Sequence, residues 1–285
     1  MEPLTYLVFG DLHGRILPAF RLATVWAREH ACPVAGFLQV GDLGYYPDPT
    51  RLDKATIRHA QKDSLELGTL DIMEPNPLAD AVFEDPDCPP GMWFTSGNHE
   101  DFDALGRLSQ ASGRQRDFVV DAYGRVRGIK DGAIAELPGN LSVGALWGVD
   151  GEGLNHRTNL PKAGYIAQRS ADELLIAPFE VLLTHDAPRD AKRTGYGSEI
   201  ILSLIHLAQP RFAFFGHYKG RGQQIEQDYG RTRVYHLSGM ELWGEGSSAE
   251  PGSVGILSWN NDAPEFEYVD DKWLKTFTRH NWKFR

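Results

Sequence analysis

The chain lacks several features that would tie it to a membrane or to an oxidising compartment. Only Cys32 and Cys88 are cysteines, too few for a disulfide framework. No run of about 18 apolar residues exists, so a membrane span is not expected. The N-terminal residues lack the basic region, the long apolar core and the cleavage site of a signal peptide. We therefore expect a cytoplasmic protein with reduced thiols and no membrane partner.

An excess of positive charge is also absent. The formal net charge is −10 at pH 7, whereas proteins that bind nucleic-acid backbones usually carry a basic surface. The average field would repel a long polyanion, although bound divalent cations would offset that field locally. This balance favours a small phosphorylated substrate or a short nucleic-acid end, and no obligate protein partner is predicted.

No internal repeat or low-complexity linker divides the chain, and we treat residues 1–285 as a single domain. In its first part, apolar runs predict strands at 4–9, 34–40 and 92–95, and helical spacing predicts a helix at 15–30. Strands that alternate with helices indicate an α/β sheet. A second helix is predicted at 196–208, and further strands at 124–128, 133–136, 140–146, 179–184, 211–215, 232–237, 254–259 and 265–269.

The long segment 46–91 separates two of these strands. It contains a helix candidate at 50–67 and a Pro- and Asp-rich passage at 84–90. Loops of this length are usually functional or disordered. Two readings remain open, an insertion that caps a site and a plain surface excursion.

Polar residues follow five predicted strands at the point where each apolar run stops. Ligands in open α/β sheets bind beyond the carboxyl ends of strands, and glycine there allows a sharp turn and a close approach. We therefore expect these side chains to converge, although singly each is typical of a turn or a core histidine. The blocks are Gly10-Asp11-Leu12-His13, Gly41-Asp42, Gly97-Asn98-His99-Glu100, Thr184-His185 and Gly216-His217.

Carboxylate, imidazole and amide ligands together favour a particular group of metals. Mn²⁺ is the first choice, with Fe, Zn, Ni and Co as alternatives, and soft Cu(I) is disfavoured. Asp11 and Asp42 would offset the charge of an ion, and one of them could bridge two. In two-metal sites the ions lie about 3.5–4 Å apart and clamp an in-line displacement at phosphorus.

At these residues the sequence resembles the calcineurin-like metallophosphoesterase superfamily. The pattern of that family is Asp-x-His, Gly-Asp, Gly-Asn-His-Asp/Glu, a lone His and Gly-His-x-His, and all five blocks occur in order here. The resemblance implies a four-layer αββα sandwich of two mixed β-sheets flanked by helices, with the metal site at the C-terminal ends of strands. It also implies a phosphoric ester hydrolase in which a metal-bound hydroxide attacks phosphorus.

The same resemblance assigns roles. The implied metal ligands are Asp11 and His13 for one ion, Asp42 for both ions, and Asn98, His185 and His217 for the second. His99 would be the general acid that faces the leaving-group oxygen. Glu100 would orient His99 through a hydrogen bond.

Lys219 departs from the family pattern, because it stands where the second His of the last block would complete the shell of the first ion. Lysine is protonated at its usual pKa and is then a poor ligand. We favour a weakened first site in which the ammonium replaces ion charge. Three ligands plus water, or a replacement ligand such as His236, are the alternatives, so one or two ions are expected per chain.

Substrate contacts are predicted at Arg15, Tyr218 and Lys219, although Arg15 could equally be the exposed start of a helix. His156 and Arg157 are weaker candidates. In the tail from Lys272 to Arg285, the aromatic residues favour a packed segment over a base-stacking platform.

A looser similarity links residues 146–149, 183–188 and 209–217 to RNA lariat debranching enzymes and related bacterial phosphoesterases. It slightly favours a phosphodiester over a phosphomonoester substrate, and the lariat substrate itself is not transferred. The alternative is a catalytically impaired protein of the same fold that binds a phosphorylated ligand or serves as a scaffold. The presence of Asp42, Asn98 and His99 argues against it, because a decayed site need not keep the acid.

Overall fold

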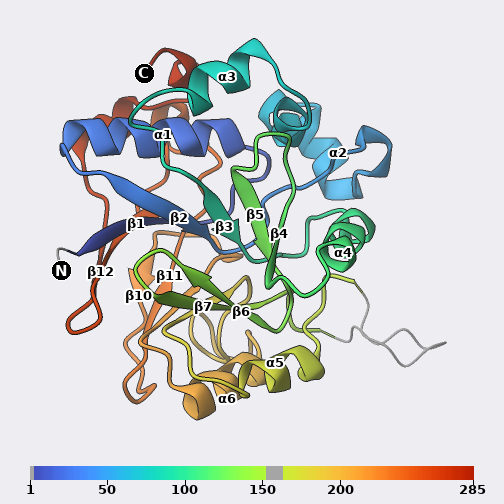
Figure 1. Ribbon diagram of the computed structural model, residues 1–285, viewed down its shortest axis with the longest axis vertical. Helices are drawn as coiled ribbons and strands as arrows, with labels where there is room; N and C mark the ends of the chain where they lie inside the picture. Colours follow the sequence, from blue (N-terminus) through green and yellow to red (C-terminus); the bar gives the residue numbers. More distant parts are fainter. Residues whose placement is uncertain (1–2, 152–162) are drawn as a thin grey trace.

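The computed structural model describes residues 3–151 and 163–285, which form two mixed β-sheets stacked face to face (Figure 1). The first sheet has the order β13-β12-β1-β2-β3-β5-β4. Its strands are β1 (Leu4–Phe9), β2 (Val34–Gln39), β3 (Met92–Phe94), β4 (Asp117–Val119), β5 (Val126–Ile129), β12 (Val254–Trp259) and β13 (Glu265–Tyr268). The second sheet has the order β10-β11-β9-β8-β7-β6. Its strands are β6 (Ala133–Leu137), β7 (Leu141–Leu146), β8 (Val181–Thr184), β9 (Phe212–Phe215), β10 (Gln223–Gln224) and β11 (Arg233–His236).

Helices cover the outer face of each sheet. The first sheet is covered by α1 (Ile16–Glu29) and α3 (Pro77–Phe83), and the second by α5 (Gln168–Leu174) and α6 (Glu199–Ala208) (Figure 1). The other helices are α2 (Lys54–Ala60), α4 (Phe102–Ala111) and the 3₁₀ helices η1 (Pro49–Arg51), η2 (Ser64–Ile72), η3 (Glu245–Ser247), η4 (Lys272–Thr276) and η5 (Trp282–Phe284). The predicted four-layer sandwich is therefore confirmed. Within the described ranges, every helix is too short or too polar to cross a membrane.

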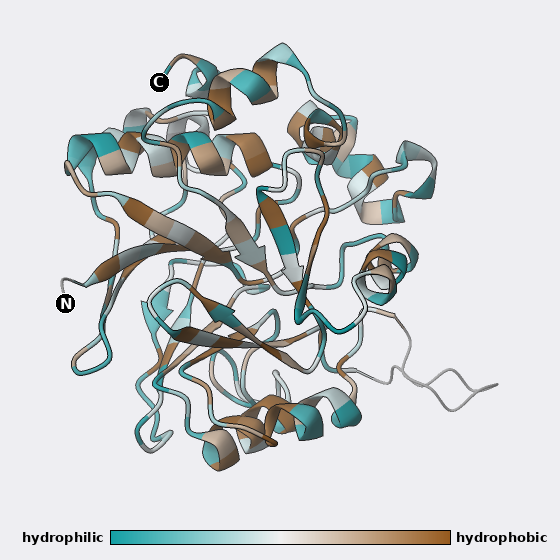
Figure 2. Ribbon diagram, in the orientation of Figure 1, coloured by the Kyte–Doolittle hydropathy of each residue, from teal (hydrophilic) through white to brown (hydrophobic). Residues whose placement is uncertain are grey.

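Three apolar clusters fill the spaces between the four layers, and brown strands mark them in Figure 2. Successive strand side chains face opposite ways, because the strand period is two residues. In β1, Leu7 and Phe9 pack under α1, whereas Tyr6 and Val8 lie between the sheets. Both sheets are thus buried on two faces, which explains why their strands are continuous apolar runs.

The parallel strands bring five loops to one place. β1, β2 and β3 are parallel neighbours in the first sheet, and β8 and β9 are parallel neighbours in the second. Because parallel strands end at the same edge, the residues that follow them lie close together.

The segment 46–91 divides between two locations. Its first part, η1 to η2, supplies Asp53, which contacts His99 at 2.6 Å, while α3 packs against α1 on the outer face. The prediction of one helix at 50–67 is wrong. Asp53 and Asp63 are extended N-cap residues that begin α2 and η2 separately. The short helices α3, α4 and α5 and the strands β4 and β10 were not predicted.

In the C-terminal tail, Phe277 and Trp282 are buried in the cluster beneath α1. The prediction of a packed C-terminal segment is therefore confirmed.

Candidate metal centre

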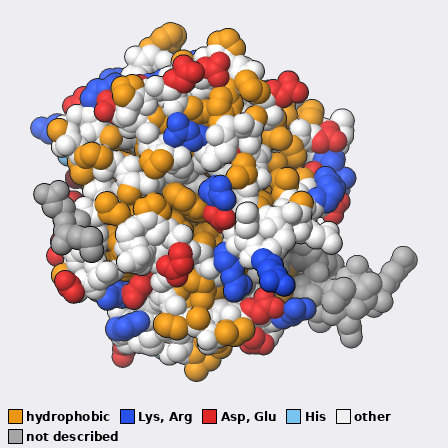
Figure 3. All heavy atoms as spheres, viewed as in Figure 1, with side chains coloured by type: hydrophobic (Ala, Val, Ile, Leu, Met, Phe, Trp, Pro, Cys, Tyr) orange, Lys and Arg blue, Asp and Glu red, His pale blue; other side chains and the backbone are white. Residues whose placement is uncertain are grey.

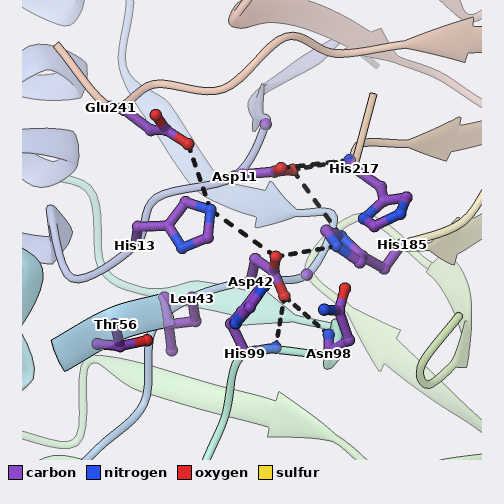
Figure 4. Close-up of polar contacts among 12 residues, drawn as sticks. Asp11, His13, Asp42, Leu43, Thr56, Asn98, His99, His185, His217 and Glu241 are labelled. Carbon is purple, nitrogen blue, oxygen red and sulfur yellow. Dashed lines mark hydrogen bonds and ion pairs between the residues drawn. The ribbon is translucent and has the colours of Figure 1, made fainter. Parts of the chain in front are cut away.

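The predicted ligand side chains converge at the carboxyl ends of the strands, as Figure 4 shows. Asp11 and His13 follow β1, Asp42 follows β2, and Asn98 follows β3. From the second sheet, His185 follows β8 and His217 follows β9. Residues up to 206 positions apart come into contact, since the backbone amide of His217 donates to Asp11 at 3.2 Å.

Glycines in these loops make room for the carboxylates. A Cβ atom at Gly97 would lie 2.1 Å from Asp42 Oδ1, and one at Gly216 would lie 2.1 Å from Asp11 Oδ1. Such distances exclude any side chain at either position. Gly97 and Gly216 are therefore required by close packing around these two carboxylates.

Three of the candidate ligands have strained backbones. His13, Asp42 and His217 have φ angles of 42°, 52° and 66°, in the left-handed region that non-glycine residues rarely adopt. Such conformations cost of order 1–3 kcal/mol each and concentrate at functional sites. Their occurrence at three members of one cluster indicates that the fold imposes the arrangement of these side chains.

The side chains form two groups that share Asp42. Asp11, His13 and Asp42 can each place a ligand atom within 4.8 Å of the others, and so can Asp42, His185 and His217. Asp42 Oδ2 lies 3.1 Å from His185 Nε2 and 3.7 Å from His13 Nε2. The carboxylate of Asp42 is thus in position to serve both groups.

Two buried atoms in the second group lack a well-formed hydrogen bond. Asn98 Oδ1 has no partner among the described residues, and His185 Nε2 faces the carboxylate of Asp42 at 3.1 Å. Burial lowers the pKa of His185, but Asp42 and Asp11 outweigh it and raise that pKa to about 10. With an ion present, a proton kept on Nδ1, 3.1 Å from the Val40 carbonyl, would leave Nε2 free to act as a metal ligand. An unsatisfied buried polar atom costs about 1–3 kcal/mol. The donor set therefore fits a divalent cation.

The electrostatics of the cluster also suit a cation. Burial raises the pKa of Asp11 to about 6, against the opposing effect of His185. Burial and the neighbouring Asp11 raise the pKa of Glu241 to about 7. These carboxylates are crowded in a poorly solvated place, where a dication would stabilise their charged forms.

His99 lies beside the two groups, and its partner is Asp53. Its Nδ1 is 2.6 Å from Asp53 Oδ2, and its ring centroid is 5.7 Å from that of His13. Burial alone would lower the pKa of His99, but Asp53 and Asp42 outweigh it and raise that pKa to about 9. His99 is thus protonated at neutral pH, the state that a general acid needs.

Glu100 does not orient His99, contrary to the sequence-based expectation. Its carboxylate is buried and accepts the backbone amides of Leu43 at 2.8 Å and Tyr45 at 2.6 Å. Glu100 therefore fixes the loop that carries Asp42. Asp53, not Glu100, holds the ring of His99. The sequence did not reveal Asp53, because it lies in the segment 46–91, which carries no motif.

Arg15 does not face the substrate side, so the prediction of a phosphate contact is wrong. Its guanidinium is fully buried and pairs with Asp63 at 2.8 Å and Glu66 at 2.6 Å. It also donates to the carbonyl oxygen of His13. Arg15 thus ties the strained His13 loop to η2 and its N-cap residue.

The gap left by Lys219 is not filled by His236. Both ring nitrogens of His236 are engaged, with the Tyr218 carbonyl at 2.8 Å and Lys192 Nζ at 3.1 Å. Lys219 itself is exposed and lines a hollow outside the cluster. The hydroxyl of Tyr218 donates to Asp186 at 2.7 Å, and its ring lies 5.1 Å from that of His217.

Glu241 contacts the first group of candidate ligands through His13. Its Oε1 lies 3.2 Å from His13 Nε2 (Figure 4), and the amide of Met240 donates to the Asp11 carbonyl at 2.8 Å. The signal was present in the sequence, because Ser238-Gly239-Met240-Glu241 closely follows the end of a predicted strand. It was missed because the acid stands outside the five blocks.

His156 and Arg157 lie outside the described residues.

Comparisons with known proteins support the fold and identify no function. No protein-family model and no curated protein matches the chain. Among solved structures, TT1561 of Thermus thermophilus is similar over 93% of this chain and 99% of its own, with a TM-score of 0.53 and 12% identity. A second solved structure has a TM-score of 0.52 and 16% identity over the same shares. The chain therefore shares its fold, along nearly its whole length, with known structures.

Replacing Arg15 with Met should destabilise the protein by about 3–5 kcal/mol, because Asp63 and Glu66 would be left as buried, unpaired charges. Urea unfolding measures the loss. Arg28→Met is the matched control, since Arg28 pairs with Asp85 and Asp87 at the surface and such pairs contribute about 0–1 kcal/mol. Equal losses in the two variants would contradict the role assigned to Arg15.

Replacing Asp53 with Asn should lower the pKa of His99 in metal-free protein, while Asn keeps the N-cap of α2. A raised histidine pKa stabilises the fold below the unfolded value of about 6.5. That stability is lost as pH rises through about 9. Histidine proton NMR titration, with His99 assigned from His99→Ala, measures the shift. Asp262→Asn removes the same charge elsewhere and should leave the titration unchanged, and an unshifted His99 in Asp53→Asn would refute the pairing.

Proposed function

We propose that this protein is a metal-dependent phosphoesterase, with a preference for phosphodiesters over phosphomonoesters. The observation that carries the proposal is the buried Asn98 Oδ1, which has no hydrogen-bond partner among the described residues, in a cluster where His185 Nε2 faces the Asp42 carboxylate at 3.1 Å. A site built to hold a divalent ion accounts for both features. The family resemblance of the five blocks supplies the reaction class.

The proposed ligands are those of the sequence analysis with one addition. Asp42 would serve two ions, with Asn98, His185 and His217 completing one shell and Asp11, His13 and Glu241 the other. Mn²⁺ remains the first choice for this mixed oxygen and nitrogen set. When bound, the ions would neutralise phosphoryl charge and lower the pKa of a coordinated water.

His99 has the properties of the proton donor in this reaction. Its Nδ1 is held by Asp53 at 2.6 Å, which leaves Nε2 to deliver a proton to the leaving oxygen. The side chain is partly exposed, at 28%, so a substrate can reach it. Asp53 stabilises the charged imidazolium until the proton is transferred.

The surroundings favour a diester. A hollow of about 530 Å³ opens beside His217 and Tyr218, and a separate hollow of about 470 Å³ is lined by Lys219. A diester carries a substituent on each side of phosphorus, and two hollows offer a place for both. Acidic and basic side chains are interspersed on the face shown in Figure 3, without one large basic region. This mixture favours a small ester or a short nucleic-acid end.

Hydrolysis of bis-p-nitrophenyl phosphate and of p-nitrophenyl phosphate, with Mn²⁺ or with EDTA, tests the proposal. We expect Mn²⁺-dependent turnover of both, faster for the diester. His99→Ala should reduce the rate by about 10²–10⁴-fold, the usual contribution of general acid catalysis, and should retain its metal. If neither ester is turned over with any of Mn²⁺, Fe²⁺, Zn²⁺, Ni²⁺ or Co²⁺, the protein is instead a phospho-ligand-binding or scaffold protein of this fold.

Removing the carboxylate of Glu241 should selectively empty one metal site. After loading with Mn²⁺ and desalting, the native protein should hold two ions per chain and Glu241→Ala one, because the first group would keep only Asp11, His13 and the shared Asp42. Elemental analysis by mass spectrometry counts the ions. Glu226→Ala, at an exposed position, is the matched control. Two retained ions in Glu241→Ala would exclude Glu241 as a ligand.

A further inference from the structure

The hollow near Lys219 is built from four separate segments of the chain. Its volume is about 470 Å³, and its principal lining residues are His59, Lys62, Asp63, Lys219, Trp243 and Arg279. Trp243 is two residues beyond Glu241, and Lys219 is two residues beyond His217. The hollow therefore adjoins the metal centre.

Positive charge gathers in this hollow although the chain as a whole is acidic. Lys62, Lys219 and Arg279 line it with a single carboxylate, Asp63. That carboxylate already pairs with the buried Arg15 at 2.8 Å, and Arg279 reaches it only at 3.7 Å. Within the described residues the two lysine ammonium groups have no acidic partner. In a protein of net charge −10, such a local excess suits an anionic group of a ligand.

An exposed tryptophan stands in the same hollow and is held in place from several sides. Trp243 is 41% exposed, and its Nε1 donates to Asp63 Oδ2 at 3.3 Å. The guanidinium carbon of Arg15 lies 5.5 Å from its ring centroid, and the ring of His59 lies 5.4 Å away. A fixed indole with free surface is suited to stacking against a planar ring such as a nucleic-acid base.

The position of Lys219 in the hollow differs from the position expected from the family pattern. In the family that the chain resembles, this position carries a metal-binding His, whereas here the exposed side chain lines the hollow and Glu241 lies near the first ion group. At the position where the family has a metal ligand, this chain thus places a lysine in the lining of the hollow.

We propose that this hollow is a subsite for a phosphorylated nucleoside, the part of the substrate that is not cleaved. The base stacks on Trp243, and a second phosphate lies among Lys62, Lys219 and Arg279. The substrate class is then a nucleoside with at least two phosphates, either an oligonucleotide end or a nucleoside polyphosphate. As a statement about substrate, it rests on the proposed phosphoesterase function.

Binding to metal-free protein tests the subsite without turnover. The probes are 5′-AMP, ribose 5-phosphate and adenosine, measured by equilibrium dialysis with tryptophan fluorescence. AMP should bind at least tenfold more tightly than either fragment. Trp243→Ala should reduce AMP binding to the level of ribose 5-phosphate, and the double variant Lys62→Ala/Lys219→Ala should reduce it to the level of adenosine.

Matched variants keep this test interpretable. Tyr196→Ala removes an exposed aromatic side chain from the other hollow, and Lys272→Ala removes an exposed ammonium group elsewhere. Both should bind AMP like the native protein. Trp243→Phe, which keeps a stacking ring if Ala disturbs folding, should retain part of the preference for AMP over ribose 5-phosphate. Equal binding of the three probes to the native protein would overturn the subsite.

A kinetic arm separates the two proposals and the two substrate sources. With Mn²⁺, Trp243→Ala should raise KM for the dinucleotide pApA or for ADP at least tenfold, whereas Lys272→Ala, outside both hollows, should leave KM unchanged. An effect on pApA alone identifies an oligonucleotide end, and one on ADP alone a polyphosphate. Turnover of bis-p-nitrophenyl phosphate without preferential AMP binding rejects the subsite and keeps the phosphoesterase. Preferential AMP binding without turnover of any ester supports the subsite and rejects the phosphoesterase function.

Discussion

The carboxylate of Asp42 is the element on which the rest of the centre depends. It is almost fully buried, at 2% exposure, and its Oδ1 accepts the amides of Asn98 and His99 at 2.8 and 2.9 Å. Its Oδ2 faces His185 and His13. One side chain therefore positions the loop that carries Asn98 and His99, and it also links the two groups of candidate ligands.

Burying such a carboxylate is costly unless positive charge accompanies it. Around Asp42 the protein supplies backbone amides, histidines and a strained left-handed backbone, together with a glycine at position 97 that leaves room for Oδ1. Each feature is unfavourable or neutral for an apolar core, and a bound cation, as proposed above, would account for their coincidence. The stability of the surrounding sandwich, with its three apolar clusters, allows this strain to persist.

Three residues outside the ligand set support it, two of them close to ligand residues in the chain and one from a separate segment. Arg15 holds the loop of His13, and Glu100 holds the loop of Asp42. Asp53 holds the side chain of His99. Two of these three roles differ from those expected from the sequence. Arg15 and Glu100 stand next to ligand residues in the chain, so a direct role was the natural interpretation, but a charged residue beside a ligand can equally point inward and stabilise its loop.

The sequence alone predicted an α/β sheet and the convergence of six side chains, because strand period and glycine turns are local properties. The four-layer sandwich was implied by the family resemblance of the five blocks. The sequence also identified Lys219 as the exception. Only the tertiary structure decided what surrounds those side chains. Asp53, Glu241 and Trp243 reach the centre or its neighbouring hollow from segments without any motif, and His236 is excluded by partners distant in sequence. Contacts of this kind depend on how the two sheets stack, which no local pattern of residues records.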